Sequence, residues 1–339
     1  MTGPALAYAR DTLEIVDEFR PDVIVSNELL LGVMTAAEAS GRPLALLTAN
    51  AWCYPTRNDV PPFGPGFPKS EGKLAKWRDA STRKLVSRFY DAGLEDLNAA
   101  RVAIGLGTLT RTLDQLQIAE RIVLGVSPSF DYRAENHEPF VYAGPLIETP
   151  SWAPTGVAPC LGGRPKVLIS FGTTYQNQKP AIERCIRALA RLDVDGLVTL
   201  GPAVSPEGLP EAPNVTVVQA ASHDEIVPGS AVVVCHGGHG TVLRPIMHGF
   251  PVLCLPMGRD HPENAARIAS RGAGLRISDR SSPRVIAAAV RRLIEDRSFR
   301  EAAVKLGAEI REETDGGATA AAALLGMVQP RGRFPQRRL

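Results

Sequence analysis

Strand-like and helix-like segments alternate regularly along the second half of this chain, from residue 165 onward. Each short apolar run is followed by a polar or Gly-rich loop and then by a helical pattern. These runs are KVLIS (166–170), GLVTL (196–200), NVTVV (214–218), AVVVC (231–235) and PVLCL (251–255). Alternation of this kind folds into a parallel sheet with helices on both faces. Because such sheets bind ligands at the carboxyl ends of their strands, the loops after these runs are the first candidates for function.

The first part of the chain shows the same alternation in a less regular form. We expect strands at 21–27, 43–48, 121–127 and 140–145, and helices at 29–40 and over most of 73–120. A chain of 339 residues usually forms about two domains, and the Pro/Gly-rich stretch 148–165 is the best linker candidate. The predicted units are an N-terminal domain (1–148), a linker (149–164), a C-terminal domain (165–327) and a basic tail (328–339).

The charges of the chain argue against a nucleic-acid partner. Lys and Arg number 38 and Asp and Glu 36, which gives a formal net charge of +2. The tail alone contributes Arg331, Arg333, Arg337 and Arg338. Without it the body is near-neutral and slightly acidic, whereas nucleic-acid-binding domains usually carry a basic surplus. We interpret the tail as a disordered, solubilising end; contact with an anionic membrane surface or with RNA is the alternative.

Cysteine usage and hydropathy favour a cytoplasmic protein. None of the five cysteines has CxxC spacing: Cys53, Cys160, Cys185, Cys235 and Cys254. This pattern fits a reducing compartment better than secretion. No apolar run approaches the ~18 residues of a membrane span, and charge at Arg10 and Asp11 comes too early for a signal-peptide core.

The turn HGGHGT (236–241) carries the densest chemistry in the chain. It follows the strand expected at 231–235 and enters a helix. Its glycines let a ligand approach the backbone, and the helix start offers free N–H groups and the positive end of a dipole. His236 adds a further donor at the strand end. The pattern favours an anion such as a diphosphate, and a tight strand–helix turn without a ligand is the alternative.

A second polar loop, PMGRDHPEN (256–264), follows one βα unit later. It also ends a strand, so a parallel sheet places it beside the first turn. Asp260 can accept hydrogen bonds from vicinal hydroxyls, and His261 can add a polar contact. Thr173 and Thr174, in the loop after the strand at 166–170, supply more donors. Together these loops predict a ligand that has phosphate next to sugar hydroxyls.

A metal ion is not expected in this region. His236 and His239 lie three residues apart, but the glycines between them form a turn, and no Cys or carboxylate stands at ligand spacing.

The Pro/Gly-rich stretch 55–72 predicts a long loop or lid. The aromatic residues in and just before it are Trp52, Tyr54, Phe63 and Phe67. These side chains either line an apolar acceptor pocket or pack the loop against its domain, and both interpretations remain open.

The run HGGHGTVLRPIMHGFPVLCLPMGRDHPENAARIASRGAGL (236–275) resembles the donor-binding motif of family-one glycosyltransferases in its bacterial form. These enzymes attach sugars from nucleotide sugars to natural products and lipids. The resemblance is strong over residues 165–280 and looser over 20–43 and 141–145. It implies an α/β protein of GT-B architecture, with two Rossmann-like domains built on doubly wound parallel sheets.

The resemblance also implies roles for individual residues. His236 and the amides of Gly240 and Thr241 would hold the diphosphate, Asp260 and His261 would bind the sugar, the backbone of Ala221 would read the base, and Asn264 would brace the loop. The full donor-binding set is Thr173, Thr174, Ala221, His236, Gly238, Gly240, Thr241, Asp260, His261 and Asn264.

Three positions depart from the family pattern. The usual Asp-Gln pair is Asp260–His261 here. The Trp that stacks on the base in plant members is Ala220, and the Glu that binds the ribose is Arg244. A UDP donor is therefore the default expectation, with dTDP or GDP open.

The first domain is expected to be incomplete relative to the family. Residues 20–27 are similar to the family's fourth strand, so roughly three βα units, or ~90 residues, would be absent before Met1. The family's catalytic His would lie in that segment. Asn27 stands at the position of the Asp that orients it, and Glu28 is the nearest alternative base in sequence.

The function implied is metal-independent and needs no cofactor. A nucleotide sugar would donate its sugar to a hydroxyl of a small apolar or lipid acceptor. One alternative is a nucleotide-sugar-binding protein, or a degenerate remnant, without transferase activity; another is a different enzyme on this fold, such as an epimerase. The missing base favours the binding protein, and the intact donor motifs favour retained binding. Neither the acceptor nor the oligomeric state is predicted.

Overall fold

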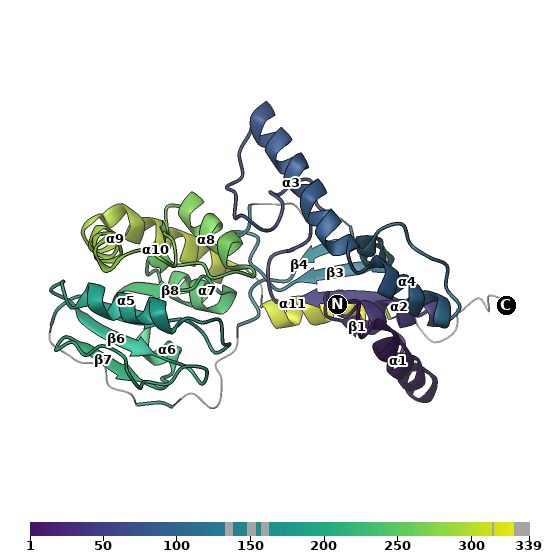
Figure 1. Ribbon diagram of the computed structural model, residues 1–339, viewed down its shortest axis with the longest axis horizontal. Coiled ribbons are helices and arrows are strands. Elements are labelled where there is room, and N and C mark those ends of the chain that lie inside the picture. The colour runs from purple at the N-terminus through teal and green to yellow at the C-terminus, as the bar shows by residue number, and fades with distance from the viewer. Residues whose placement is uncertain (133–137, 148–153, 157–162, 314, 329–339) are drawn as a thin grey trace.

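A computed structural model describes residues 1–132, 138–147, 154–156, 163–313 and 315–328 of the protein. Two parallel sheets, each with its own helices, lie side by side along the long axis of the molecule (Figure 1). Most of the predicted linker and all but Val328 of the predicted tail lie outside the described residues. No helix in the described ranges has the length and apolar character needed to cross a membrane.

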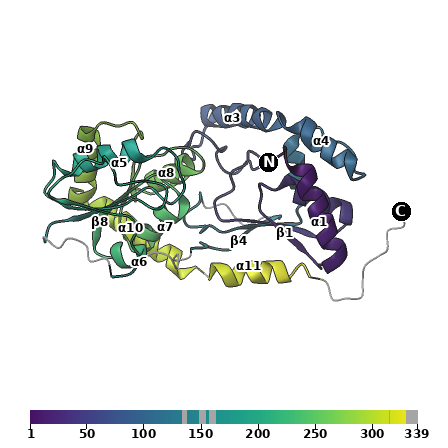
Figure 2. The same cartoon turned by 60° about the horizontal axis from the view of Figure 1, so that its bottom comes forward.

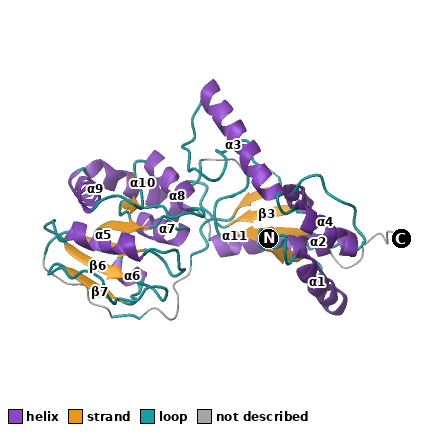
Figure 3. Ribbon diagram, in the orientation of Figure 1, coloured by secondary structure: helices purple, strands orange, loops and turns teal. Residues whose placement is uncertain are grey.

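The smaller sheet has four parallel strands in the order β1-β2-β3-β4. Figure 3 shows the strands of both sheets in orange among the purple helices. These strands are β1 (Ile24–Ser26), β2 (Leu44–Thr48), β3 (Arg121–Leu124) and β4 (Phe140–Tyr142). The helical segments around them are α1 (Ala5–Phe19), α2 (Leu31–Ser40), α3 (Lys73–Asp91), α4 (Leu94–Ala103) and the 3-10 helix η1 (Thr112–Ile118). The strands and helices predicted here from apolar periodicity are confirmed. Helix α2 ends where Gly41 takes the left-handed conformation, with φ of 65°.

The larger sheet has six parallel strands in the order β10-β9-β8-β5-β6-β7. These strands are β5 (Lys166–Ser170), β6 (Asp195–Thr199), β7 (Val215–Val218), β8 (Ser230–Cys235), β9 (Val252–Cys254) and β10 (Gly274–Arg276). Its helices are α5 (Lys179–Leu189), α6 (His223–Ile226), α7 (His239–Met247), α8 (His261–Ser270), α9 (Pro283–Glu295) and α10 (Arg297–Glu312). The strand order reverses between β5 and β8, which is the arrangement of a doubly wound sheet. The predicted α/β class is confirmed.

The last helix, α11 (Gly316–Leu325), returns to the smaller sheet. Ala323 packs in one apolar cluster with Val123 of β3, and its carbonyl accepts a hydrogen bond from Arg121 at 3.1 Å. Figure 2 shows α11 on the opposite face of this sheet from α3 and α4. At its start, Gly316 lies so close to the segment after β4 that a Cβ would be 2.8 Å from the carbonyl oxygen of Pro145. The chain therefore crosses between the domains twice.

A buried ion pair joins the two domains beside this crossing. Arg267 of α8 contacts the carboxylate of Asp131, which follows β3, at 2.8 Å, and both side chains are almost fully buried. The hydroxyl of Tyr142 donates to the second carboxylate oxygen at 2.6 Å. Burial alone would raise the pKa of Asp131, but Arg267 and these hydrogen bonds hold it below its usual range. The negative charge of Asp131 is thus retained inside the domain interface.

Helix α8 also holds the Pro/Gly-rich loop of the smaller domain. The Glu263 carboxylate accepts hydrogen bonds from the amides of Gly64 and Gly66, at 3.0 and 2.8 Å. Arg276 donates to the carbonyl of Gly66 at 2.7 Å. Gly66 has φ of 65°, and a Cβ there would be 2.2 Å from the carbonyl oxygen of Pro262, so a larger residue does not fit. The loop predicted from its prolines and glycines therefore lies on the start of α8.

Removing one member of the interface ion pair should be costly. Arg267→Met leaves the buried Asp131 carboxylate unpaired and is expected to lower the free energy of unfolding by about 3–5 kcal/mol in urea titrations. Adding Asp131→Asn to the same chain should recover part of that loss, because the uncompensated charge is gone. The control is Arg187→Met in the exposed Arg187–Glu183 pair, which should cost no more than about 1 kcal/mol. Equal losses for the two methionine variants would contradict a stabilising role for the buried pair.

Candidate active site

A cavity of about 660 Å³ opens between the two domains, at the carboxyl ends of strands from both sheets. On one side, Asn50 follows β2 and Ile147 follows β4. On the other side, the lining residues follow β5 to β9 of the larger sheet. They include the point between β5 and β8 where the strand order reverses, which is where open α/β sheets bind ligands. The volume is that of a site for a small molecule.

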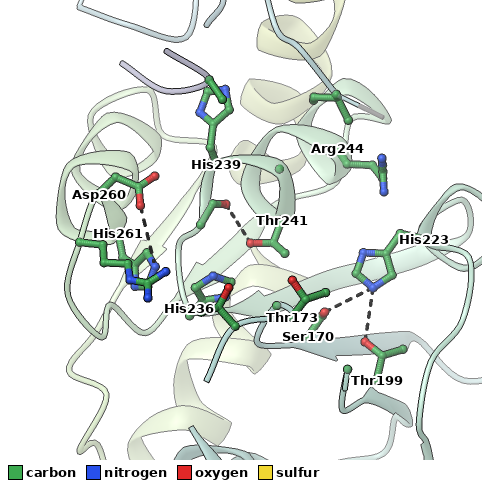
Figure 4. Close-up of a pocket in the computed structure, with 18 of the residues that line it drawn as sticks. Ser170, Thr173, Thr199, His223, His236, His239, Thr241, Arg244, Asp260 and His261 are labelled. Carbon is green, nitrogen blue, oxygen red and sulfur yellow. Dashed lines mark hydrogen bonds and ion pairs between the residues drawn. The ribbon is translucent and has the colours of Figure 1, made fainter. Parts of the chain in front are cut away.

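The fold brings nearly all of the predicted donor-binding residues to this cavity (Figure 4). The residues that line it are Thr173, Thr174, Ala221, His236, Gly238, Gly240, Thr241, Asp260 and His261. Asn264, the remaining member of the set, is buried and hydrogen-bonded to Asp260 at 2.7 Å.

The ring of His236 is held between two glycines. A Cβ at Gly238 would lie 2.3 Å from its Nε2 atom, and a Cβ at Gly172 would lie 2.8 Å from its Cε1 atom. Any side chain at either position would therefore displace the ring. The edge of the ring meets His261, with ring centroids 4.4 Å apart. His236 is 6% exposed, and its Nδ1 atom has no hydrogen-bond partner in the described part of the chain, so a polar ring atom is left unsatisfied at the cavity wall.

Helix α7 begins beside this ring. Nothing lies within 4 Å of the position that a Cβ would take at Gly240, so its backbone is open to a ligand. The Thr241 hydroxyl donates to the carbonyl of Gly238 at 2.8 Å and so shapes the turn. In an α-helix the amides of the first turn have no intrahelical partner, and they carry the positive end of the dipole. This helix start is therefore suited to an anion.

Asn264 ties the second polar loop to the first. Its Nδ2 atom donates to the Asp260 carboxylate at 2.7 Å and to the carbonyl of Gly237 at 2.9 Å. The Nδ1 atom of His261 accepts from the amide of Met257 at 3.3 Å, and its Nε2 atom lies 3.9 Å from Asp260. Asp260 and His261 are thus fixed beside the HGGHGT turn.

His223 is a cavity residue that the sequence patterns did not single out. Its Nε2 atom lies 3.3 Å from the hydroxyls of both Ser170 and Thr199 (Figure 4). Arg244, which also lines the cavity, forms an ion pair with Asp224 at 3.0 Å. The signal available for His223 was its position just after the strand at 214–218. A lone histidine there has no motif to mark it.

His239 lines the same cavity, although the sequence patterns gave it no role in binding the donor. Its ring meets Phe130 of the smaller domain edge-on, with centroids 5.9 Å apart. Neither ring nitrogen has a hydrogen-bond partner among the residues described. Over the same ranges, no three His, Cys, Asp or Glu side chains are grouped to hold a metal ion.

The four aromatic residues near the Pro/Gly-rich loop are not among the residues that line this cavity. Trp52 and Tyr54 are buried in the core of the smaller domain, with ring centroids 5.0 Å apart. Phe67 lies under the guanidinium of Arg78, at 4.3 Å. Phe63 is half-buried in the loop. Their role in binding an acceptor stays a prediction.

Asn27 and Glu28 follow β1. The Asn27 side chain is exposed and accepts a hydrogen bond from the amide of Leu29 at 2.9 Å, which makes a local turn. Glu28 is half-buried; its Oε2 atom lacks a hydrogen-bond partner within the described residues, and burial raises the pKa of its carboxyl. Of the two, Glu28 has the chemistry of a proton acceptor.

Three histidines that line the cavity, His236, His239 and the half-buried His223, are neutral at pH 7. Burial lowers the pKa of His236 to about 3, and the charges of His261 and Arg259 act in the same direction. Burial also lowers the pKa of His223 and of His239 to about 4 in each case. In the unfolded chain each histidine has its ordinary pKa of about 6.5 and binds a proton below that pH. In the folded protein the same histidines stay neutral down to about pH 4. Stability therefore falls as the pH drops from about 6.5 toward 4.

When the pH falls from 7 to 5, each of these histidines should lower the free energy of unfolding by about 2 kcal/mol. His239→Gln removes one of them and should reduce the loss over this interval by that amount in urea titrations. His248→Gln is the control, because His248 is exposed. If His239→Gln lost as much stability on acidification as the parent protein, His239 would not be a buried neutral group.

The sequence matches one known family model and is similar to a known protein over most of its length. Residues 183–322 match the family model described as erythromycin biosynthesis protein CIII-like, C-terminal domain. The chain is 29% identical over 314 residues to 4'-demethylrebeccamycin synthase of Lentzea aerocolonigenes, covering 89% of this chain and 73% of that protein.

The fold has close counterparts among solved structures. The glycotransferase of kitacinnamycin superposes with a TM-score of 0.72 at 24% identity, covering 96% of this chain and 80% of that chain. The glycosyltransferase VinC, solved in complex with dTDP, gives 0.64 at 20% identity, covering 95% and 79%. The predicted GT-B architecture is confirmed. Residues 183–322 therefore form an EryCIII-like C-terminal domain, and the chain that contains them is an actinobacterial-type relative of the GT-B glycosyltransferases.

Proposed function

We propose that the protein binds a nucleoside diphosphate sugar in the interdomain cavity and transfers the sugar to a hydroxyl of a small apolar or lipid acceptor. One observation carries this proposal. The anion-binding start of α7 and the Asp260 carboxylate lie together in one cavity, at the point where the strand order reverses. A phosphate suits the start of α7, and sugar hydroxyls suit the Asp260 carboxylate beside it.

The donor would lie across the cavity in a defined order. The diphosphate lies on the amides of Gly240 and Thr241 and against the ring of His236. The sugar lies on Asp260 and His261. The base lies beside the backbone of Ala221, with the loop of Thr173 and Thr174 closing the phosphate side.

The ribose side of the cavity favours dTDP over UDP. Arg244 stands where the resemblance expects a ribose-binding carboxylate, and it is paired with Asp224 at 3.0 Å. A deoxyribose has one hydroxyl fewer to satisfy than a ribose, so it needs that carboxylate less. The dTDP complex of VinC, a protein of the same fold, is in keeping with this preference.

Transfer requires a negative charge to be stabilised and a proton to be removed. As the acceptor hydroxyl attacks the anomeric carbon, the bond from that carbon to the diphosphate oxygen breaks, and charge develops on the leaving diphosphate. The α7 dipole and His236 face that charge. The proton of the hydroxyl goes to a general base, for which we propose Glu28.

Two observations support Glu28 as that base. Its carboxyl has a raised pKa through burial and an oxygen without a hydrogen-bond partner among the described residues. In addition, Glu28 follows β1, which pairs with β2, and the cavity residues Ala49 and Asn50 follow β2. The carboxyl end of β1 thus lies beside the strand that leads into the cavity, although Glu28 itself is not among the residues that line it.

Two substitutions should separate the diphosphate from the sugar contacts. His236→Ala should weaken dTDP or UDP binding about tenfold or more, because a hydrogen bond to a charged group contributes ~1.5–3 kcal/mol. Asp260→Ala should weaken binding of the nucleotide sugar and spare the nucleotide alone. Calorimetry with the nucleotide and with the nucleotide sugar measures both effects, and His248→Ala is the control. Equal losses for both ligands in Asp260→Ala would contradict a sugar contact.

Loss of the general base should leave binding intact. Glu28→Gln is expected to reduce transfer ~100- to 10,000-fold while nucleotide-sugar affinity measured by calorimetry stays unchanged. Turnover is assayed against phenolic and lipid hydroxyl acceptors, and Asn27→Ala serves as the neighbouring control. Full turnover in Glu28→Gln would reject Glu28 as the base. Nucleotide-sugar binding without turnover in the parent protein would favour the alternative of a binding protein.

A further inference from the structure

Helix α3 carries large apolar side chains that the fold leaves uncovered. It is 19 residues long, and none of its residues is buried. Leu74 is 85% exposed, Trp77 71%, Leu85 69% and Phe89 78%. In Figures 1 and 2 the helix lies on the outside of the molecule. Several large apolar side chains exposed on one helix favour an interaction site over a purely solvated surface.

These four side chains share one side of the helix. At 100° per residue, positions 74, 77, 85 and 89 fall within one apolar stripe, which spans ~22 Å along the axis. Lys73 and Lys84 fall just outside one border of this stripe, and Arg88 falls just inside the same border. The stripe and its basic border together form the outer face of α3.

The opposite face of α3 is anchored to the protein. Arg83 donates to the carbonyl of Arg57 at 2.9 Å, and the ring of Tyr90 packs on Tyr54 with centroids 5.4 Å apart. Arg78 lies on the stripe side of the helix, between Leu85 and Phe89 in angle, and its guanidinium covers the ring of Phe67. The helix is therefore held in place while the apolar side chains of its outer face stay exposed.

The charge of α3 is not neutralised locally. The helix contains six Lys or Arg and two Asp. Asp79 pairs with Arg78 at 2.7 Å, and Asp91 pairs with Arg111 at 3.4 Å. Lys73, Lys84 and Arg88 have neither a hydrogen bond nor an ion pair within the described ranges. Three free cations therefore border the apolar stripe.

We propose that the outer face of α3 docks the protein on an anionic lipid surface. The apolar stripe would enter the boundary between headgroups and acyl chains, and the three cations would contact lipid phosphates. Helices with an apolar face that includes Trp and a Lys/Arg-rich polar face bind membranes in this way. A protein partner fits less well, because protein interfaces are depleted in lysine. This docking is independent of the sugar transfer proposed above.

Vesicle binding by the full-length chain tests this proposal. Flotation with vesicles of phosphatidylcholine containing phosphatidylserine should capture the protein, and pure phosphatidylcholine should capture much less. The emission of Trp77, at 71% exposure, should shift to the blue on binding, and Trp77→Phe should abolish the shift. A triple variant, Lys73→Gln, Lys84→Gln and Arg88→Gln, should lower the affinity about 100-fold, because each cation near an anionic surface contributes about fivefold.

Matched variants separate the charge of α3 from the overall charge of the protein. Three exposed cations of α9 and α10 provide the same loss of charge elsewhere: Arg284→Gln, Arg291→Gln and Lys305→Gln. That variant should bind vesicles as the parent does, as should a variant with the tail arginines 331, 333, 337 and 338 changed to Gln. Unchanged nucleotide binding by calorimetry verifies folding of every variant. The proposal is overturned if anionic vesicles do not bind the protein, if the α3 triple variant binds normally, or if either control variant loses as much affinity.

Discussion

The contact between Arg267 and Asp131 sets the relation of the two domains, and the cavity depends on it. A guanidinium and a carboxylate that are both buried are tolerated only when they neutralise each other and satisfy their remaining hydrogen bonds. Arg267 meets this requirement from α8, and Asp131 meets it from the loop after β3. Since α8 begins at His261, the same helix carries one wall of the cavity and its link to the other domain. The helix that starts at the cavity residues Asp260 and His261 is thus held by an ion pair that does not itself line the cavity.

Much of this architecture was predictable from local sequence patterns. The runs at 166–170 and 231–235 are strands because their Val, Leu and Ile residues are buried on both faces, and the loops after them meet because parallel strands end at one edge. Asp260 and the HGGHGT turn were expected to be neighbours for the same reason. These inferences use only the period of the pattern and the geometry of a parallel sheet.

What local patterns did not predict depends on contacts between distant parts of the chain. The position of Trp52 and Tyr54 beside a loop left their role open, yet Trp52 packs on Phe140 of β4 and Tyr54 on Tyr90 of α3. Glu263 has the pattern of a polar residue at a helix start, yet its carboxylate holds amides almost two hundred residues away in sequence. His223 and His239 have no spacing that marks them, because what defines them is burial beside a cavity shared by two domains. Such residues require the tertiary structure.

The return of α11 to the smaller sheet has a mechanical consequence. The polypeptide passes between the domains after Ile147 and again before Gly316, and Gly316 lies against Pro145, so the two passages are neighbours. Two adjacent passages of the chain define an axis, and a rotation of one domain about that axis stretches neither passage. A swing about this axis would open the cavity only if α8 released Asp131 and the amides of Gly64 and Gly66, so these contacts hold the two domains against that rotation.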